Sequence, residues 1–206
     1  IGDLGALREF IDWSAEQGFR VVQLLPVNET GNDNSPYNAI SSVALDPLTI
    51  EITPEALPDL TAEEIKKITS SADLAALLEG SVIYPEIKEL KWVLLERAVE
   101  NFLTTSWKKN DKRGRSFRAF LKSEAAWLNG YTFFRVLIDE NGGTERWDLW
   151  PEGQRSFAQA QAWLAQQKPS RRIHFERRLR LVSYVQWIAW EQWRKMHDYA
   201  TSNDVA

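Results

Sequence analysis

The sequence of 206 residues contains no cysteine, which excludes disulfide bonds and thiolate metal sites. Its two histidines, His174 and His197, lie far apart in helical patterns without a second ligand nearby, so we expect packing or surface roles and no metal site. No basic block could neutralise several phosphates, and no apolar run approaches the roughly 20 residues of a membrane span. The first residues also lack the pattern of a signal peptide. We therefore expect neither nucleic acid nor a membrane as a partner.

What is present is typical of a globular protein with a substantial core. Hydrophobic residues make up 44% of the chain, and the net charge of −4 comes from both signs interspersed. Ten tryptophans are many for this length. Tryptophan is often a core residue, but sugar-binding proteins also place aromatic faces against pyranose rings, so this count only favours carbohydrate slightly.

The first fifty residues predict the start of an α/β fold. Asp3 can cap a helix over residues 4–17, and Gly18 can end it. The run FRVVQLLP, residues 19–26, is short, apolar and rich in β-branched residues, which predicts a strand buried on both faces. In α/β sheets and barrels the ligand lies beyond the carboxyl end of such strands. Here that end leads into the polar loop NETGNDNSPY, residues 28–37.

This loop has the composition of a binding site. Pro36 restricts its own φ and the conformation of Ser35, so it would present Tyr37 with little conformational freedom left to lose. The neighbouring short polar side chains can bond backbone or a polyhydroxylated ligand; they are Asn32, Asp33, Asn34 and Ser35. The alternative is an ordinary turn in which Asn and Asp cap the backbone and Tyr37 packs beneath.

The rest of the chain reads as mainly helical. Residues 40–52 alternate loosely around Pro47, which predicts an irregular edge or a short hairpin. Thr61 and Glu64 form a capping-box pattern, and Pro85 can open a long helix. Three further helices are predicted at residues 116–139, 154–167 and 172–200.

Two groups of tryptophans, and one run of arginines, have contrasting expected roles. Trp187, Trp190 and Trp193 recur at spacing three, which predicts one shared face packed in the core, whereas Trp147 and Trp150 lie in a loop-like stretch and are better candidates for exposed aromatics. A basic run is expected to be an exposed helix start with internal ion pairs; it comprises Arg171, Arg172, Arg177, Arg178 and Arg180.

Ordered sequence blocks resemble the 4-α-glucanotransferases, also called amylomaltases or disproportionating enzymes. The blocks are IGDLG, QLLPV, TG followed by NSPYNAISSVALDP, IYPEIKELKWVLLERAVENF, FRAFLKSEAAWLNGYTFF, GG with WDLWP, and YVQWIAWEQW. The SPY loop with its flanking LLP and TG is the most specific of them. The resemblance covers most of the chain and is weak between about residues 50 and 80.

The resemblance implies an α/β fold: part of a (β/α)8 TIM barrel, with one helix and one barrel strand, that carries a large, mainly α-helical inserted subdomain. We expect residues 1–50 to be the amino-terminal barrel segment with the SPY loop, residues 51–170 the helical insertion, and residues 171–206 a long helix returning to the barrel. The remainder of the barrel would then be a partner of this chain. Relatives occur in bacterial cytoplasm and in plastids, and we expect the cytoplasmic type.

The resemblance also implies a chemistry. Family members transfer α-1,4-glucan chains between maltooligosaccharides by a retaining double displacement, with an Asp nucleophile, a Glu acid/base and a second Asp, and without a cofactor or metal. Tyr37 would lie against a glucosyl ring beside the nucleophile, with Ser35, Asn34 and Asp33 as neighbouring sugar contacts. The family's carboxylate motifs, of the types RIDHFRG, AEDLG and THD, are absent here. We therefore expect no catalytic residue in this chain, and an isolated chain that is inactive.

Two other interpretations fit the sequence. The chain could be an independently folding, non-catalytic glucan-binding or interaction module. It could also belong to another polysaccharide-active barrel, such as an α-amylase relative. Products separate the last case, because transfer yields both longer and shorter glucans and hydrolysis yields only shorter ones.

Overall fold

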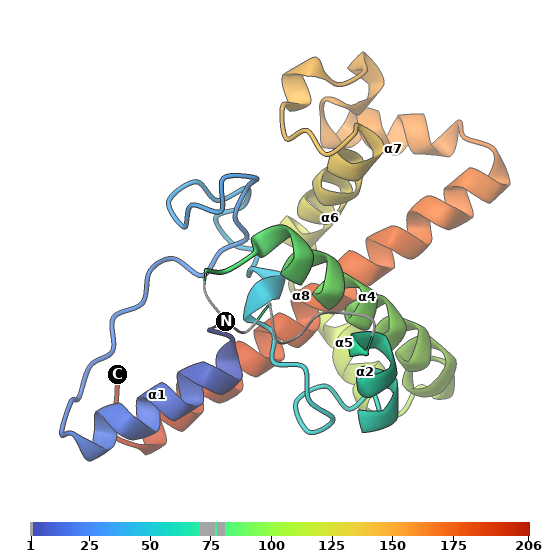
Figure 1. Ribbon diagram of the computed structural model, residues 1–206. Coiled ribbons are helices and arrows are strands. Elements are labelled where there is room, and N and C mark those ends of the chain that lie inside the picture. Colours follow the sequence, from blue (N-terminus) through green and yellow to red (C-terminus); the bar gives the residue numbers. More distant parts are fainter. Residues whose placement is uncertain (1, 71–76, 78–80) are drawn as a thin grey trace.

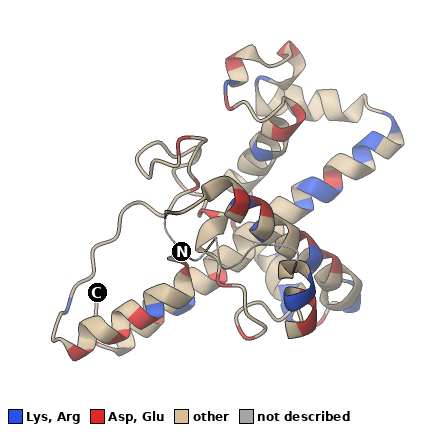
Figure 2. Ribbon diagram, in the orientation of Figure 1, with Lys and Arg blue, Asp and Glu red and all other residues tan. Residues whose placement is uncertain are grey.

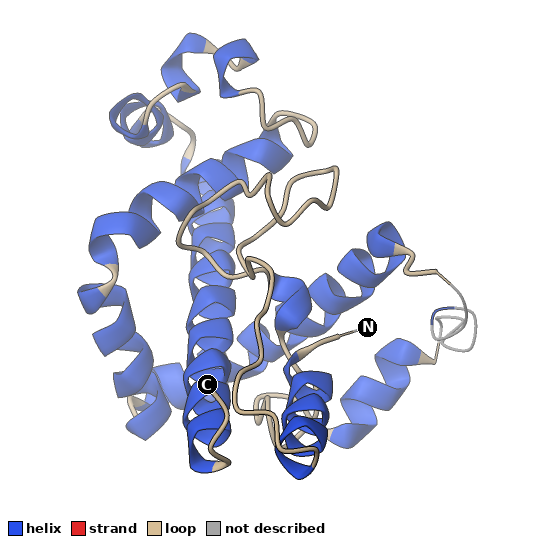
Figure 3. Ribbon diagram, turned by 90° about the vertical axis from the view of Figure 1, so that its left-hand side faces the viewer, coloured by secondary structure: helices blue, strands red, loops and turns tan. Residues whose placement is uncertain are grey.

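The computed structural model describes residues 2–70, 77 and 81–206 as an assembly of helices and loops (Figure 3). No strand is formed within these residues; three short 3-10 turns and one π-helix accompany the α-helices. The α-helices are α1 (Leu4–Glu16), α2 (Ala62–Thr69), α4 (Tyr84–Phe102), α5 (Lys112–Ser123), α6 (Ala125–Glu140), α7 (Phe157–Ala165) and α8 (Pro169–Ser202). The 3-10 turns are η1 (Pro47–Thr49), η3 (Trp147–Leu149) and η4 (Glu152–Gln154), and the π-helix is η2 (Leu103–Trp107).

The 34-residue helix α8 is the axis of the molecule (Figure 1). Its first part packs against α6, its middle against α4 and α5, and its end against α1. Helix α1 runs in the same direction as the end of α8. Two contacts show this: Asp12 accepts a hydrogen bond from Tyr199, and farther along both segments Arg20 pairs with Asp204. Helix α8 therefore connects α1, at the start of the chain, with α4, α5 and α6.

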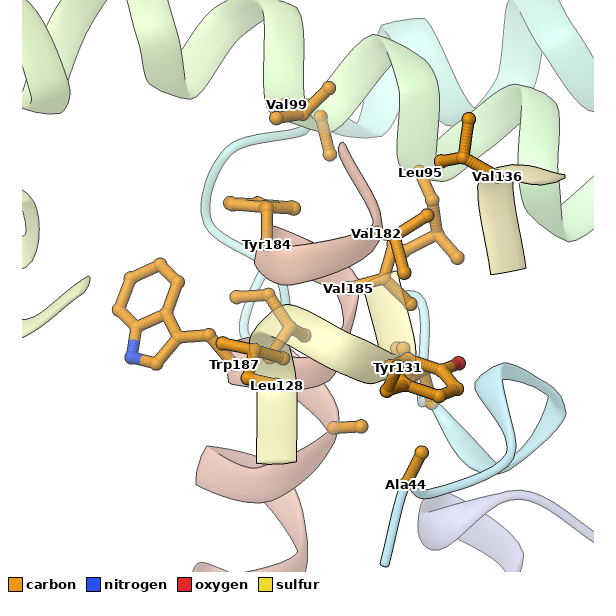
Figure 4. Packing of buried hydrophobic residues seen from close by; sticks show 14 of the residues in the cluster. Ala44, Leu95, Val99, Leu128, Tyr131, Val136, Val182, Tyr184, Val185 and Trp187 are labelled. Atoms are coloured by element: carbon orange, nitrogen blue, oxygen red, sulfur yellow. The ribbon is translucent and has the colours of Figure 1, made fainter. Parts of the chain in front are cut away.

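The main hydrophobic core surrounds the middle of α8. Tyr184 and Trp187 are fully buried and meet Phe102 of α4 at ring-centroid distances of 5.2 and 5.4 Å. Phe117 of α5 lies edge-on to Phe102 at 5.5 Å. Figure 4 shows Trp187 and Tyr184 together with Leu128 and Tyr131 of α6 and Leu95 and Val99 of α4. Interlocked aromatic pairs of this kind add about 0.5–1.5 kcal/mol each beyond the burial of their area.

A second, smaller cluster joins α1 to the end of α8. It consists of Leu4, Ile11, Met196 and Val205, with Trp193 packed against it. Trp187, Trp190 and Trp193 thus all contact a core, which confirms the prediction from their spacing.

Buried glutamine side chains of α8 hold the extended segment that follows the polar loop. Gln186 accepts a hydrogen bond from Leu45 N at 2.9 Å and donates to Leu45 O at 2.8 Å. Gln192 bonds Glu51 in the same way, accepting from its N at 2.9 Å and donating to its O at 3.0 Å. Each amide replaces the backbone partners that a neighbouring strand would supply.

Several helix boundaries follow the predicted signals. Asp3 caps α1 by accepting hydrogen bonds from Gly5 N and Ala6 N, and Gly18 takes a left-handed φ of 81° just after its end. Thr61 and Glu64 form a complete capping box at α2. Pro85 lies in the first turn of α4, as its restricted φ favours. The arginines of α8 are partly paired with α6, since Arg178 contacts both Asp139 and Glu140.

The prediction of one helix over residues 116–139 is wrong in its continuity. The structure forms α5 and α6, which meet at Glu124 with φ −94° and ψ 4°. The hydroxyl of Ser123 donates to Phe120 O, and the carboxylate of Glu124 accepts from Trp127 Nε1 at 2.7 Å. These local side-chain bonds accompany the break, as is common where Ser and acidic residues compete with helical backbone bonding.

The predicted buried strand at residues 19–26 is not formed either. Val21 is 71% exposed and Leu25 58% exposed, and the segment runs as an extended loop along α1. A strand satisfies its backbone groups through neighbouring strands, and no strand flanks this segment within the described residues. Ala206 bonds its backbone at Arg20 and Val22, which is too little pairing to form a strand.

Two glycines of the helices provide a test of the packing. In Gly114→Ala the new Cβ would lie 2.3 Å from Ser106 O, so the backbone must shift, at a cost of about 1–3 kcal/mol. We expect the melting temperature to fall by several degrees, since about 2–4 °C corresponds to 1 kcal/mol at this size. The control is Gly130→Ala in α6, where nothing lies within 4 Å of the new Cβ and stability should be unchanged or higher. Equal melting temperatures for the two variants would contradict the packing.

Candidate functional site

The polar loop and the residues that follow it, up to residue 46, form an irregular hairpin. Antiparallel bridges join Asn28 to Leu45 and Thr30 to Ala39. Glu29 lies between them, donating its N–H to Ala44 O at 3.0 Å and accepting from Ile40 N at 2.9 Å. The expectation of an irregular edge or short hairpin thus fits residues 40–46, while Pro47 opens the turn η1.

The tip of the loop is held by Asp33. Its Oδ1 accepts from Ser35 N at 3.0 Å, and its Oδ2 accepts from Asn38 Nδ2 at 2.9 Å. The bond from Asn38, followed by that from Ser35, lowers the pKa of Asp33 below its ordinary value. Asp33 therefore acts as the local cap that brings Ser35 and Asn38 into one turn.

Asn34 ties the same tip to the helical body. It has a left-handed φ of 53°, a conformation that Asn tolerates better than most residues. Its Oδ1 accepts a hydrogen bond of 2.7 Å from Lys88 Nζ on α4. The tip is thereby fixed from within by Asp33 and from outside by Lys88.

Tyr37 stands on this fixed tip with its ring in solvent. It is 77% exposed, the highest exposure of any large hydrophobic or aromatic side chain in the described residues. It does not pack beneath the loop, so that part of the alternative interpretation is wrong, although Asp33 does cap local backbone as that interpretation required. Asp33, Asn34, Ser35 and Tyr37 are thus all brought together on one exposed turn.

A second contact anchors the base of the tip to the loop after α6. Asn32 N donates to Glu145 Oε1 at 3.0 Å, and Asn32 Nδ2 donates to Gly143 O at 3.4 Å. Gly31 allows this approach, because a Cβ at that position would lie 2.8 Å from Glu145 Oε2. A side chain at residue 31 would displace the Glu145 carboxylate and so disturb its bond with Asn32 N.

Beneath the loop, Glu29 is buried in a polar network with α6. Its carboxylate accepts from the Tyr131 hydroxyl and, at 3.0 Å, from Arg135 Nε. Burial raises the pKa of Glu29 above its ordinary value, although Arg135 and Tyr131 act in the opposite direction. Burial alone would lower the pKa of Arg135, but the carboxylates of Glu29 and Asp139 raise it. The network connects the hairpin to the core through Tyr131.

A cavity of about 140 Å³ lies between this loop, α4 and α6. Its lining carries charges of both signs, including Glu29, Asp46, Lys91 and Arg135. Several of these already bond protein atoms: Lys91 Nζ donates to Leu48 O and Ile50 O, and Asp46 accepts from Thr30. No group of three or more His, Cys, Asp or Glu residues in the described part of the chain is arranged to hold a metal ion.

The two tryptophans expected to be exposed differ. Trp147 is 54% exposed, but Trp150 is only 2% exposed and donates from Nε1 to Thr144 O at 3.0 Å. The prediction is therefore right for Trp147 and wrong for Trp150. The reason is that the WDLWP stretch forms η3, which turns Trp150 toward Phe134 of α6.

Sequence reasoning missed the residues that fix the loop. Lys88, Tyr131, Arg135 and Glu145 contact it from positions 54 to 113 residues away in the chain. No local pattern encodes such pairings. Only the glycine of the TG pair was a usable signal, because an isolated Gly often marks a close approach of two chain segments.

Comparison with known proteins gives a consistent family. Residues 1–206 match the glycoside hydrolase family 77, described as 4-alpha-glucanotransferase. A 4-alpha-glucanotransferase of Chlamydia pneumoniae is 33% identical over 208 residues, which cover 100% of this chain and 36% of the relative. Another, from Aquifex aeolicus, is 29% identical over 209 residues, covering 100% and 38%.

A solved structure has the same fold over this region. It is titled amylomaltase from Streptococcus agalactiae in complex with acarbose, and it aligns with a TM-score of 0.71 at 21% sequence identity. The alignment covers 100% of this chain and 38% of that one. The chain thus spans little more than a third of the length of the proteins it matches. In the described residues, no helix is long and apolar enough to cross a membrane.

Because the carboxylate of Glu29 is buried, we expect the stability of the fold to depend on pH. Because its pKa is raised in the folded state, its ionisation costs stability as pH rises above the unfolded value of 4.5. Glu29→Gln keeps the shape without the charge, so its stability relative to the unmodified chain should increase as pH rises from about 4 to 7. Urea unfolding across this pH range measures the difference.

The matched variant Glu29→Ala should be destabilised at every pH by about 1–3 kcal/mol, because it leaves the buried donors of Tyr131 and Arg135 without their acceptor. If the stability of Glu29→Gln instead fell relative to the unmodified chain with rising pH, the attraction of Arg135 would outweigh burial, and the assignment would be wrong.

Proposed function

The chain belongs to the 4-alpha-glucanotransferase family, and we propose that it forms the part of such an enzyme that presents Tyr37 to an α-1,4-glucan. The complete enzyme would transfer glucan chains between maltooligosaccharides by a retaining double displacement. This chain would supply glucan-binding surface, and the catalytic carboxylates would lie outside it.

The observation that carries the proposal is an exposed aromatic on a rigid turn. Tyr37 is 77% exposed, yet its turn is held by Asp33 from within, by Lys88 through Asn34, and by Glu145 through Asn32. A pre-organised aromatic face loses little conformational entropy when a pyranose ring stacks on it. The acarbose complex of the Streptococcus agalactiae amylomaltase supports ligands of the glucan type for this fold.

Polar groups around Tyr37 can complete a sugar site. The Ser35 hydroxyl has no hydrogen-bond partner among the described residues, and Asn34 Nδ2 has only a 3.5 Å contact to Asn32 O. Both are available to sugar hydroxyls. Asp33 already accepts two bonds, but each carboxylate oxygen can accept another. Ser35, Asn34 and Asp33 are therefore proposed as substrate contacts beside Tyr37.

The acidic groups near the loop support a non-catalytic role for this chain. A retaining enzyme needs two free carboxyl groups about 5 Å apart on opposite sides of the scissile bond. Glu29 is buried against Arg135, Asp46 caps η1, and Glu145 accepts from Asn32 N. Each of these carboxylates has a structural partner.

The segment of residues 19–26 is proposed to be a barrel strand whose neighbours come from the rest of the enzyme. Val22 N donates to Ala206 O and Ala206 N donates to Arg20 O, both at 2.9 Å. This alternation, in which one residue bonds the two residues flanking its partner, is the pattern of parallel strands. On this basis residues 1–50 and 171–206 contribute to the barrel, and residues 51–170 are the helical insertion.

A second candidate is an independently folding glucan-binding module, favoured by the continuous core of α4, α5, α6 and α8. The apolar surface near α1 argues against it. Phe10, Trp13, Phe19, Val21 and Leu25 are all between 48% and 71% exposed. Figure 2 shows that the strip after α1 carries little charge. A stable independent module would rarely leave so many large apolar groups in water.

Removing the Tyr37 ring tests the site. In the intact enzyme, Tyr37→Ala should lower kcat/KM for maltotriose disproportionation by about 10- to 100-fold, whereas Tyr37→Phe should retain most of it because stacking needs the ring. Product ladders from maltotriose measure both. The control in the same enzyme is Ile173→Ala, at an apolar side chain that is 60% exposed on α8, which should leave kcat/KM unchanged. Unchanged kcat/KM in Tyr37→Ala would remove Tyr37 from the site.

The barrel assignment makes a separate prediction for the isolated chain. The double substitution Val21→Lys with Leu25→Lys should reduce binding of a hydrophobic dye and raise solubility, because both side chains are exposed here. The same substitutions should abolish folding of the intact enzyme, where these side chains would be buried. Ile173→Lys, at a residue 60% exposed on α8, is the control and should leave the enzyme folded. An intact enzyme that tolerates the double substitution would contradict the assignment.

A further inference from the structure

A second cavity, of about 370 Å³, lies beside the Tyr37 loop and is separate from the charged cavity beneath it. Helix α6, the stretch from η3 to η4 and the start of α7 form its walls. The volume is within the range of about 300–1,000 Å³ that is usual for small-molecule sites. Ile40, three residues after Tyr37, lines both cavities, so this one begins on the other side of the same loop.

Aromatic rings form the apolar part of this cavity, and most of them are held in place. Trp150 packs on Phe134 with centroids 5.4 Å apart and an interplanar angle of 32°. Phe133 and Phe157 meet edge-on at 5.2 Å and 85°. Trp147 contributes an indole that is 54% exposed and has no ring partner within the described residues. A flat aromatic face is thus available at the entrance of a preformed hollow.

Polar donors stand at the same cavity. Arg155 Nε donates to Trp150 O at 2.7 Å, which fixes the guanidinium, and its two terminal nitrogens have no partner among the described residues. Gln154 is 7% exposed, and its Oε1 accepts from Asn141 Nδ2 at 2.8 Å while its Nε2 has no protein partner in the same part of the chain.

The Gln154 amide nitrogen is not sealed inside the protein. Within the described residues, the buried side-chain atoms without a partner are Arg113 Nε and Trp187 Nε1 only. Gln154 Nε2 is neither, so it retains access to solvent, and Gln154 is one of the residues that line the cavity. A nearly buried amide whose nitrogen has no partner in the described residues therefore lies in the wall that Trp147 also lines.

The charge of the cavity favours a neutral ligand. Among the described residues that line it, Arg155 is the only charged one. The carboxylate of Asp148 is already bound by Arg146 through two hydrogen bonds of 2.9 and 2.7 Å. An anion would find a single cation, whereas a neutral polyhydroxylated ring would find an aromatic face and several donors.

We propose that this cavity is an accessory carbohydrate subsite, in which a glucosyl unit of an α-glucan stacks on Trp147 and bonds Gln154 and Arg155. A pyranose ring has an apolar C–H face and hydroxyls at its edge, which matches an indole face bordered by fixed donors. The subsite rests on the proposed function for the identity of the ligand. Because Ile40 connects it to the Tyr37 loop, a glucan chain held there would be tethered close to the site at Tyr37.

The test uses the intact enzyme labelled with fluorotryptophan and titrated with maltohexaose, with the Trp147 signal assigned by its loss in Trp147→Phe. We expect a saturable shift of the Trp147 fluorine resonance. Gly130→Leu should abolish it without altering Trp147 itself, because residue 130 lines the cavity and a Cβ there points into open space. Because Trp147→Ala removes the reporter, its effect is measured by calorimetry in the Tyr37→Ala background, where it should weaken maltohexaose affinity by about tenfold, the equivalent of one lost stacking contact.

Two comparisons distinguish a failure of the subsite from a failure of the proposed function. In Tyr37→Ala the Trp147 shift should persist, and cellohexaose, a β-linked glucan, should give a much smaller shift. Maltohexaose binding, measured by calorimetry, that is lost in Tyr37→Ala and gives no shift at Trp147 would overturn the subsite and leave the proposed function standing. No binding by either measurement would overturn both. A Trp147 shift that survives Gly130→Leu unchanged would mean that the sugar binds outside the cavity, and the subsite would again be wrong.

Discussion

The architecture depends on a requirement that buried amides impose: each must find a hydrogen-bond partner. Gln186 and Gln192 of α8 are buried, and both satisfy their amides on the backbone of one extended segment, at Leu45 and Glu51. An unpaired buried polar group costs about 1–3 kcal/mol, so these bonds hold the segment against α8 firmly. The Tyr37 loop begins at Asn28, which pairs with Leu45 of this segment. Helix α8 therefore fixes the position of the base of the loop through Gln186.

The helices that pack around α8 also position the Tyr37 loop. Helix α4 supplies Lys88 to the tip of the loop, α6 supplies Tyr131 and Arg135 to its base, and the stretch after α6 supplies Glu145 to its side. The exposed tyrosine is thus held by three separate elements.

The two cavities on either side of the loop differ in the chemistry they offer. The one beneath it is small, and its charged side chains largely bond one another or the backbone. The one beside it is larger, aromatic and bordered by donors that have no protein partner in the described residues. The difference follows from which elements meet: charged faces of α4 and α6 in the first case, and the aromatic faces of α6 and α7 in the second.

The sequence by itself determined the local features and the family. Asp3, Thr61 with Glu64, and Pro85 set helix starts through backbone chemistry within a few residues, and the spacing of Trp187, Trp190 and Trp193 placed them toward the core. The SPY loop was recognisable because its residue types are contiguous.

Only the tertiary structure decided the remaining features, because each depends on groups distant in the sequence. Residues 19–26 have the composition of a buried strand, but a strand exists only where neighbours pair with its backbone. Trp147 and Trp150 are three residues apart in one motif, yet η3 exposes the first and buries the second against Phe134. The partners that fix Tyr37's loop lie 54 to 113 residues away, a separation across which local propensity carries no information.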